Sequence, residues 1–192
     1  MRAVIADDEG LIRRYVREIL ESNGYEVAGE AEDGMDAVTV CRDTRPDFVI
    51  MDIHMPVMTG LEAVRVINEE QLAGFVIILT ADRNKETAEK AAELDVMGYV
   101  AKPADENTLI PAIKIAEHEY RQIKGMKQEI DRTREALEGR KHIERAKGLI
   151  MERQSMTEKE AFRYIRKLSM DKGKTMAEVA KTMLKAYGEA VK

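Results

Sequence analysis

Cysteine and long apolar stretches are scarce in this sequence of 192 residues. A single cysteine, Cys41, excludes an internal disulfide and is typical of a reducing cytoplasm. No apolar run approaches the ~20 residues that a membrane-spanning helix requires, and the opening stretch MRAVIADDEG lacks the apolar core of a signal peptide. We therefore expect a cytoplasmic protein without a membrane segment, long enough for one large domain or for one ordinary domain and a small one.

Charged residues make up 35% of the chain, and they are distributed unevenly. Residues 121–192 hold 19 basic and 11 acidic residues, a net charge of +8, whereas residues 1–120 carry −13, which together give the overall −5. This split indicates an acidic domain joined to a basic one. A basic domain favours an anionic partner.

The acidic half alternates between short apolar runs and helical patterns. Valine and isoleucine are frequent in the runs, which is typical of strands buried on both faces of a parallel sheet. The expected strands are residues 2–6, 25–31, 47–51, 75–79 and 98–102. The expected helices lie near residues 10–22, 34–43, 60–70 and 84–94 and from about 105. Five β-α units in succession predict an α/β fold with a doubly wound, five-stranded parallel sheet.

Chemically active side chains lie where these strands end. The first strand leads into Asp7 and Asp8, the third into Asp52, the fourth into Thr80 and the fifth into Lys102. Ligands of such sheets bind outside the carboxyl ends of the strands. Three converging carboxylates repel one another unless a cation lies among them, and their hard oxygens suit Mg²⁺. A lysine and a hydroxyl beside them indicate a site that handles a phosphoryl group.

Four motifs in this half, ADDE, VIMDIHMPVMTGLE, LTA and YVAKP, resemble those of the two-component response-regulator receiver domain over residues 1–120. The resemblance implies a flavodoxin-like fold in which Asp52 accepts a phosphoryl group from a phosphohistidine of a sensor histidine kinase. The implied Mg²⁺ ligands are Asp7, Asp8, Asp52 and the backbone carbonyl of His54. The implied contacts to the phosphoryl oxygens are Thr80 and Lys102, and the implied switch residues are Thr80 and Tyr99. Apart from autodephosphorylation, such a protein is not an enzyme.

Alternatives remain open for this half. Tyr99 can instead be an ordinary packing residue. A haloacid-dehalogenase-type phosphatase also uses an aspartate at a strand end, but it would require a second carboxylate two residues later, where this chain has His54. We assign no role to the side chain of His54.

From about residue 105 the helical pattern continues past the end of an ordinary receiver domain. A heptad reading places charged Lys127 and Arg134 at a positions, which weakens pairing. We predict a helical coiled-coil connector over residues 113–139 that dimerises marginally, so that phosphorylation can shift it toward the dimer. The expected seam is Ala116, Tyr120, Ile123, Ile130 and Leu137. The alternative is a solvated helical spacer, and Gly139 is the expected boundary to the next module.

Residues 140–192 contain three short amphipathic patterns, which predict a small all-α three-helix domain. The first covers about 140–153, with Ile143, Ala146 and Ile150 on one face. The other two begin with the capping boxes TEKE at Thr157 and TMAE at Thr175. Their apolar stripes are Ala161, Phe162, Ile165 and Leu168, and Val179, Ala180, Met183, Leu184 and Tyr187.

The basic residues of this domain avoid the apolar stripes. A helical rotation of about 100° per residue turns Arg163, Arg166 and Lys167 away from the core and sets Arg145 and Lys147 at the flanks of the first helix. Gly148 falls on the outer surface, where its missing side chain would let RNA or another helix approach. The net positive charge favours a nucleic-acid surface over an ordinary solvated face.

The stretch RKHIERAKGLIMERQSMTEKEAFRYIRKLSMDKGKTMAEVAKTML resembles the ANTAR domain, the RNA-binding output module of transcription antiterminators. One departure is Arg153-Gln154, where the family commonly has a glycine. The resemblance implies a homodimer that binds paired hairpins in an mRNA leader and prevents a terminator hairpin, so that transcription continues. It implies no small-molecule substrate. The candidate RNA contacts are Arg145, Lys147, Gly148, Arg163, Arg166, Lys167, Lys172 and Lys174, and Tyr164 either stacks on a loop base or packs.

Two other functions stay open. A DNA-binding response regulator with a helix-turn-helix output would need a recognition helix rich in polar groups, and TMAEVAKTMLKAYGEAVK offers only scattered Lys and Thr. A receiver-based protein-interaction module would need no nucleic acid. Rising salt distinguishes this last possibility, because RNA binding weakens steeply with salt.

Overall fold

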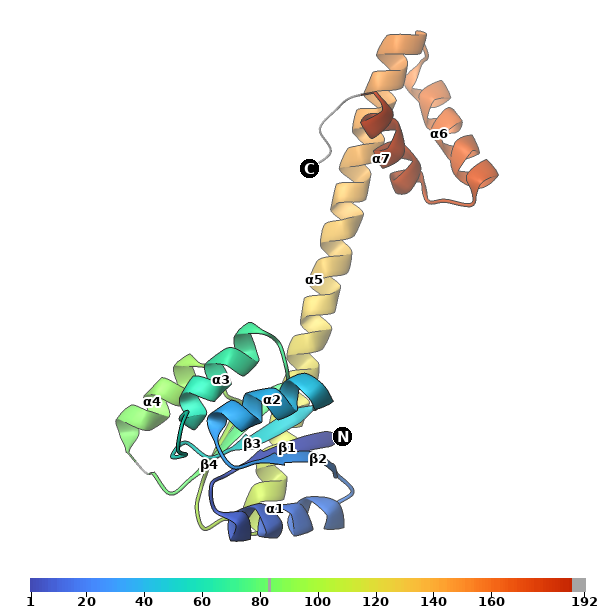
Figure 1. Ribbon diagram of the computed structural model, residues 1–192. Helices are drawn as coiled ribbons and strands as arrows, with labels where there is room; N and C mark the ends of the chain where they lie inside the picture. The colour runs from blue at the N-terminus through green and yellow to red at the C-terminus, as the bar shows by residue number, and fades with distance from the viewer. Residues whose placement is uncertain (83, 188–192) are drawn as a thin grey trace. The chain divides into compact units, whose positions relative to one another are not determined.

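The structure is a computed structural model that describes residues 1–82 and 84–187 (Figure 1). Residues 188–192, which we assigned to the C-terminal module, lie outside the described residues. The chain forms two compact units, residues 1–124 and 125–192. Among the described residues, no helix combines the length and the apolar character needed to cross a membrane.

The first unit has the doubly wound α/β fold that the sequence predicts. All of its strands run parallel, in the order β2-β1-β3-β4-β5. The strands are β1 (Arg2–Ala6), β2 (Glu26–Ala31), β3 (Phe48–Met51), β4 (Phe75–Thr80) and β5 (Gly98–Ala101). The helices between them are α1 (Gly10–Ser22), α2 (Gly34–Thr44), α3 (Gly60–Glu69) and α4 (Lys85–Glu93).

Helices cover both faces of this sheet, which explains why the central strands are almost purely apolar (Figure 1). Every residue of β3 and of β4 is buried. Helices α2, α3 and α4 enclose one core, which includes Val64 and Ile67. Helix α1 and the beginning of α5 (Glu106–Gln154) enclose the other, which includes Leu20 and Ile113. Because the strands are parallel, their carboxyl ends lie at one edge of the sheet.

The second unit consists of the C-terminal part of α5 with α6 (Glu158–Lys172) and α7 (Met176–Ala186). Its small core combines Ile150 from α5, Ile165 from α6 and Leu184 from α7. Both predicted capping boxes are confirmed. The hydroxyls of Thr157 and Thr175 accept hydrogen bonds from the backbone three residues later, and the glutamates at those positions accept from the threonine backbones.

One predicted core residue of this unit lies on the surface. Phe162 is 41% exposed, whereas its neighbours on the stripe, Ala161 and Ile165, are buried. The physical reason is the size of the unit, because three short helices enclose only a narrow core. Phe162 lies outside that core and remains in contact with solvent.

The predicted connector and the predicted first helix of this unit form one continuous helix. Helix α5 continues from Glu106 to Gln154 and includes both Gly125 and Gly139. A Cβ atom at Gly139 would lie 3.0 Å from the Cβ of Ala177, which is in the first turn of α7. Gly139 therefore has a packing role, since it lets α7 approach α5 closely. It does not interrupt the helix.

Candidate functional site

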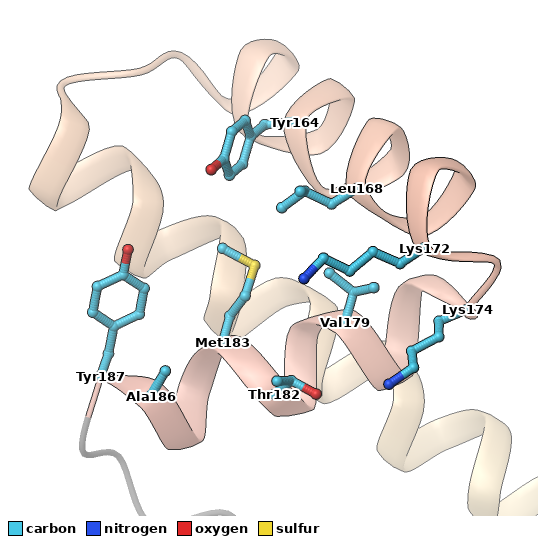
Figure 2. A pocket seen from close by; sticks show the side chains of 9 residues that line it. All are labelled: Tyr164, Leu168, Lys172, Lys174, Val179, Thr182, Met183, Ala186 and Tyr187. Atoms are coloured by element: carbon cyan, nitrogen blue, oxygen red, sulfur yellow. The ribbon is translucent and has the colours of Figure 1, made fainter.

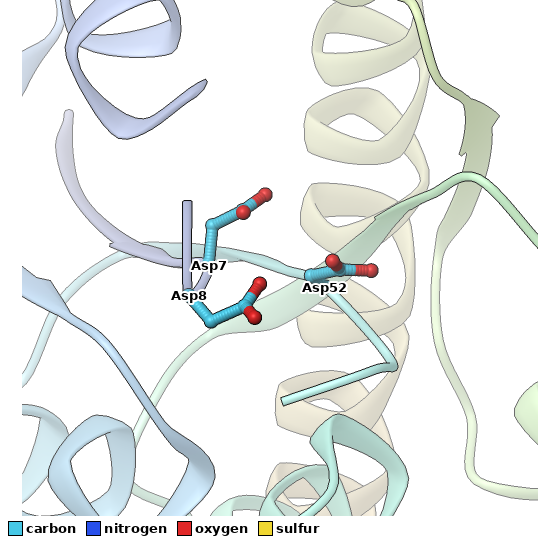
Figure 3. Close-up of side chains that lie close together, drawn as sticks. All are labelled: Asp7, Asp8 and Asp52. Carbon is cyan, nitrogen blue, oxygen red and sulfur yellow. The ribbon is translucent and has the colours of Figure 1, made fainter. Parts of the chain in front are cut away.

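The carboxyl edge of the sheet brings three aspartates together (Figure 3). Ala6 of β1 pairs with Met51 of β3, so Asp7 and Asp52 follow at the ends of adjacent strands. Carboxylate oxygens of Asp7, Asp8 and Asp52 lie within 4.8 Å of one another. Asp7 and Asp52 are buried, and Asp8 is exposed. Strand register thus produces the acidic cluster that the sequence predicts.

Lys102 reaches this cluster from the position after β5. Its Nζ atom lies 2.6 Å from Oδ2 of Asp7 and 2.7 Å from Oδ2 of Asp52. Burial by itself lowers the pKa of Lys102, but the hydrogen bonds to Asp52 and Asp7 outweigh burial and raise that pKa. Burial raises the pKa of Asp7, and the opposing bond from Lys102 only partly offsets this. One ammonium among three carboxylates leaves excess negative charge, and such an oxygen-rich acidic set is typical of a Mg²⁺ site.

The beginning of α3 holds the backbone of Asp52 in place. The backbone N–H of Gly60 donates a 2.9 Å hydrogen bond to the carbonyl oxygen of Ile53. A Cβ atom at Gly60 would lie only 1.8 Å from the carbonyl oxygen of Asp52, so this close approach requires glycine. Gly60 was not among the residues predicted from the sequence. The available signal was its place directly after Thr59, which caps α3.

The two predicted switch residues, Thr80 and Tyr99, both contact Asp82. Thr80 is buried, and its hydroxyl oxygen accepts a 3.2 Å hydrogen bond from the backbone N–H of Asp82. Tyr99 is half-buried, and its hydroxyl donates a 2.8 Å hydrogen bond to the backbone carbonyl of Asp82. Thr80 thus ends β4 at the edge that carries Asp52. The switch roles of both residues stay predictions.

Asp82, which was not predicted from the sequence, forms several polar contacts at this edge. Its carboxylate accepts hydrogen bonds from the Asn84 backbone at 2.7 Å and from the Thr87 hydroxyl at 2.8 Å. The backbone bond from Asn84, followed by the bond from Thr87, lowers the pKa of Asp82. Nε2 of His54 lies 3.2 Å from Oδ2 of Asp82, so the contact between these two side chains connects the loop after β3 with the loop after β4. An aspartate two residues before a capping asparagine was the available signal.

Five of the predicted RNA contacts are exposed cations on α6 and the turn after it. None of them forms an ion pair with a described residue. They are Arg163, Arg166, Lys167, Lys172 and Lys174.

Lys147 differs from these cations, and its predicted role as an RNA contact needs correction. The residue is buried, with 7% of its surface exposed. Its Nζ atom lies 2.7 Å from a carboxylate oxygen of Glu158 and 2.9 Å from one of Glu144. The hydrogen bonds to Glu158 and then Glu144 raise the pKa of Lys147. Its charge is therefore satisfied inside the unit, where it ties α5 to the first turn of α6.

Gly148 lies on the outer surface of α5, as predicted from its helical position. A Cβ atom added there would have no heavy atom of the described chain within 4 Å, apart from the helix's own backbone. Another helix of the described chain therefore does not pack against Gly148. Arg145 is exposed on the same helix. Contact of either residue with RNA stays a prediction.

The predicted dimer seam divides into a buried part and an exposed part. Ala116 is fully buried in the core of the first unit, and the ring of Tyr120 lies 5.5 Å from that of Phe75. Both residues are occupied by the sheet of their own chain, which corrects their assignment to the seam. The other members, Ile123, Ile130 and Leu137, are each at least half exposed.

Comparison with known proteins agrees with this division of the chain. Residues 3–114 match the response regulator receiver domain, and residues 131–184 match the ANTAR domain. The chain is 40% identical over 187 residues to the transcriptional regulatory protein PdtaR of Mycobacterium tuberculosis, an alignment that covers 97% of this chain and 91% of PdtaR.

Solved structures match about 60% of the chain. The signal receiver domain of a modulated diguanylate cyclase from Desulfovibrio desulfuricans is 30% identical with a TM-score of 0.58, over 63% of this chain and 96% of that one. A DNA-binding response regulator of the LuxR family from Staphylococcus aureus is 32% identical with a TM-score of 0.57, over 60% and 97%.

The two domain matches cover both candidate sites. The receiver match contains the aspartate cluster and Lys102, and the ANTAR match contains the exposed cations of α6. Response regulators that combine a receiver domain with an ANTAR domain are not catalytic enzymes. The chain therefore belongs to the response regulators that combine an N-terminal receiver domain with a C-terminal ANTAR domain.

Proposed function

We propose that this protein is a transcription antiterminator controlled by phosphorylation of Asp52. A sensor histidine kinase supplies the phosphoryl group, the phosphorylated chain forms a homodimer, and the dimer binds paired hairpins in an mRNA leader. Bound hairpins prevent an overlapping terminator hairpin, so transcription continues. The observation that carries the proposal is the presence, in one chain, of the Asp52–Lys102 cluster and of exposed cations on α6.

Asp52 is the proposed acceptor. One of its carboxylate oxygens attacks the phosphorus of the kinase phosphohistidine in line. The new O–P bond forms as the P–N bond breaks, and the histidine leaves with the electron pair. The 2.7 Å contact between Lys102 and Oδ2 of Asp52 places the ammonium where it can bond to an oxygen of the transferred group.

The acidic cluster fits a magnesium ion. Asp7, Asp8 and Asp52 would hold it together with the backbone carbonyl of His54. The exposed position of Asp8 leaves this side of the cluster accessible from solvent. When bound, the cation neutralises negative charge on the phosphoryl oxygens.

Thr80 and Tyr99 are the proposed switch. The Thr80 hydroxyl turns toward a phosphoryl oxygen and donates a hydrogen bond to it. This movement breaks its present bond with the Asp82 backbone. Tyr99 is bonded to the same residue, so a shift of Asp82 changes the support of its ring. A local charge change at Asp52 thereby alters the surface around α4 and β5.

The exposed side chains of α5 suggest how two copies pair. Met126 is 59% exposed, and it joins Ile123, Ile130 and Leu137 in one stripe. With these isoleucines at a and Met126 at d, Lys127 and Arg134 move to e, and Glu129 occupies g. In a parallel pair, Glu129 of one copy then faces Arg134 of the other. The polar Thr133 at the next d position keeps the association weak. A change of a few kcal/mol on phosphorylation of the receiver can therefore shift the population from monomer to dimer.

RNA is the proposed partner of the second unit. Cations such as Arg163, Arg166 and Lys167 neutralise phosphates, and hairpin loops present unstacked bases. A homodimer presents two such units, which matches a pair of hairpins.

The test measures molar mass and RNA binding together, with and without beryllofluoride as a phosphoryl mimic. The probe is a pool of RNAs with two consecutive hairpins and randomised loops. We expect the mimic to raise both dimer fraction and RNA affinity, and Asp52→Asn to abolish both effects. Asp43→Asn, an exposed carboxylate on α2, is the control and should behave as wild type. A response that survives in Asp52→Asn would refute the acceptor assignment, and specific binding of duplex DNA in place of the RNA pool would refute the antiterminator.

A further inference from the structure

A pocket of about 350 Å³ lies between α6 and α7 in the second unit (Figure 2). Its apolar lining includes Val179, a buried residue of the core, and Leu168 and Met183, which pack against that core. Pockets that bind small groups usually have ~300–1,000 Å³ and combine an apolar lining with a few polar groups. Here the polar groups come from Tyr164, Tyr187, Lys172 and Lys174, together with Thr182, whose hydroxyl donates a hydrogen bond to the backbone carbonyl of Glu178.

The two tyrosines present aromatic rings from different parts of the unit. Tyr164 projects from α6 and is 37% exposed. Tyr187 follows the last turn of α7, and the guanidinium of Arg153 lies over its ring, 4.9 Å from the centroid. This cation–π contact orients the ring at the pocket. Neither tyrosine hydroxyl has a hydrogen-bond partner among the described residues, so both are available to a ligand.

The two lysines give the pocket its charge. Figure 2 shows the side chain of Lys172 extending from α6 toward the pocket, with Lys174 beyond the turn. Gly173 between them has φ of 60° and ends α6, which places both lysines at one turn. Neither forms a salt bridge with a described residue, in contrast to Lys147, although Lys174 lies close enough to Glu178 to contribute to the lowered pKa of that carboxyl. The pocket therefore combines flat aromatic surfaces with exposed positive charge, which suits a planar base attached to a phosphate.

We propose that this pocket takes one unstacked nucleobase from an RNA hairpin loop. Tyr164 and Tyr187 contact the base, and Lys172 and Lys174 hold the adjacent phosphates. Proteins read single-stranded loops by stacking bases on aromatic side chains, and lysines neutralise the backbone. The proposal rests on the RNA-binding function above and locates where a base is recognised.

A polymer fits the surroundings better than a free nucleotide does. The exposed cations Arg166 and Lys167 do not line the pocket, yet they lie on the same helix as Tyr164. They add positive charge that a single nucleotide in the pocket would leave unused. A chain of phosphates continues past the pocket and can contact them.

The test uses the full-length protein with beryllofluoride and one RNA selected from the two-hairpin pool. Tyr164→Ala should weaken binding at least about five-fold, the lower end of the effect of one stacked base. Phe162→Ala is the matched control, because Phe162 lies on the same helix with similar exposure but does not line the pocket. It should bind as wild type does. Tyr164→Phe keeps the ring and should retain affinity, which guards against a folding defect in the alanine variant.

Salt dependence tests the lysines separately. Lys172→Ala and Lys174→Ala should each reduce the slope of log affinity against log salt by about one. Lys181→Ala, on the exposed side of α7 and outside the pocket, should leave the slope unchanged. Equal slopes in all four proteins would overturn the phosphate contacts.

Removing the bases of the RNA one at a time identifies the occupant. We expect that removing the base at one loop position weakens RNA binding by the wild type. The same removal should not weaken binding by Tyr164→Ala any further, because both changes remove the same contact. Strict additivity at every position would overturn the proposal, as would Tyr164→Ala binding like Phe162→Ala. Tighter binding of free AMP, GMP, CMP or UMP than of the RNA would also overturn it. If the wild type binds no RNA of the pool, the RNA-binding function itself is refuted.

Discussion

Gly60→Ala tests how the fold positions the phosphoryl acceptor. Gly60 begins α3 and is buried beside the backbone of Asp52. An added Cβ atom would lie 1.8 Å from the Asp52 carbonyl oxygen and 2.8 Å from its carbonyl carbon. Both atoms belong to the backbone, so no side-chain rotation relieves the clash. Either α3 or the loop after β3 must move.

The size of the effect follows from this geometry. Overpacking that forces backbone shifts costs about 1–3 kcal/mol, and a backbone clash belongs at the upper end of that range. Gly10→Ala is the matched control, because Gly10 begins α1 and its Cβ would lie 3.6 Å from the flexible side chain of Arg13. That contact is ordinary, so alanine there should be neutral or stabilise by less than about 1 kcal/mol.

Urea unfolding followed by circular dichroism measures the difference. With a dependence of about 1–3 kcal/mol per molar urea, the midpoint of the receiver transition should fall by about 1 M in Gly60→Ala and stay near wild type in Gly10→Ala. Phosphorylation of Asp52 by acetyl phosphate should slow in Gly60→Ala but not in Gly10→Ala, because only the first substitution displaces the Asp52 carboxylate from Lys102. Equal midpoints for the two variants would refute the reasoning.

Four further predictions concern single residues. Burial raises the pKa of Asp7 above 3.8, so its ionisation lowers the stability of the protein as pH rises through the folded-state pKa. Asp7→Asn should therefore be more stable than wild type in urea, and the difference in free energy of unfolding should grow from acid to neutral pH. A difference that does not change with pH would show that the pKa of Asp7 is not raised. Burial raises the pKa of the Cys41 thiol to about 12, so a disulfide reagent at mildly alkaline pH should label only unfolded chains, and fast labelling of the native protein would contradict this. Tyr99→Phe removes the donor to the Asp82 carbonyl and should cost about 1 kcal/mol in urea unfolding, whereas no loss would show that water replaces the bond. Gly148→Ala adds a methyl group into open space and should stabilise α5 by up to about 1 kcal/mol in thermal unfolding; lower stability would reveal a packing partner, and loss of RNA binding alone would place RNA at this residue.

The receiver cluster shows how much a local pattern can establish. Strands buried on both faces must be apolar, so residues 47–51 and 75–79 are recognisable in the sequence, and their β-α alternation leads to a parallel sheet. Parallel strands end at one edge, which brings Asp7 and Asp52 together. Sequence reasoning missed Gly60 and Asp82 at the same edge. Their importance depends on a neighbouring carbonyl and on side chains from other loops, and no periodic pattern records such contacts.

The connector and the basic unit show the limit of helical periodicity. Ala116 and Ile123 occupy the same heptad position, yet Ala116 is buried against the sheet and Ile123 is exposed. Spacing along one helix determines which residues share a face, but it does not determine which part of that face another element covers. Gly139 illustrates the same point, because its role comes from the approach of Ala177 and not from a break in α5.

The sequence by itself determined the order of elements, the capping boxes at Thr157 and Thr175, the acidic cluster and the basic character of the C-terminal unit, because these depend on neighbouring residues and strand direction. The tertiary structure alone decided which cations remain free. Lys147 and Lys172 were both predicted as RNA contacts, but Glu144 and Glu158 form salt bridges with Lys147, whereas no described carboxylate forms one with Lys172. Pairing of charges depends on how helices pack, and that is why only the folded unit separates a structural lysine from one available to RNA.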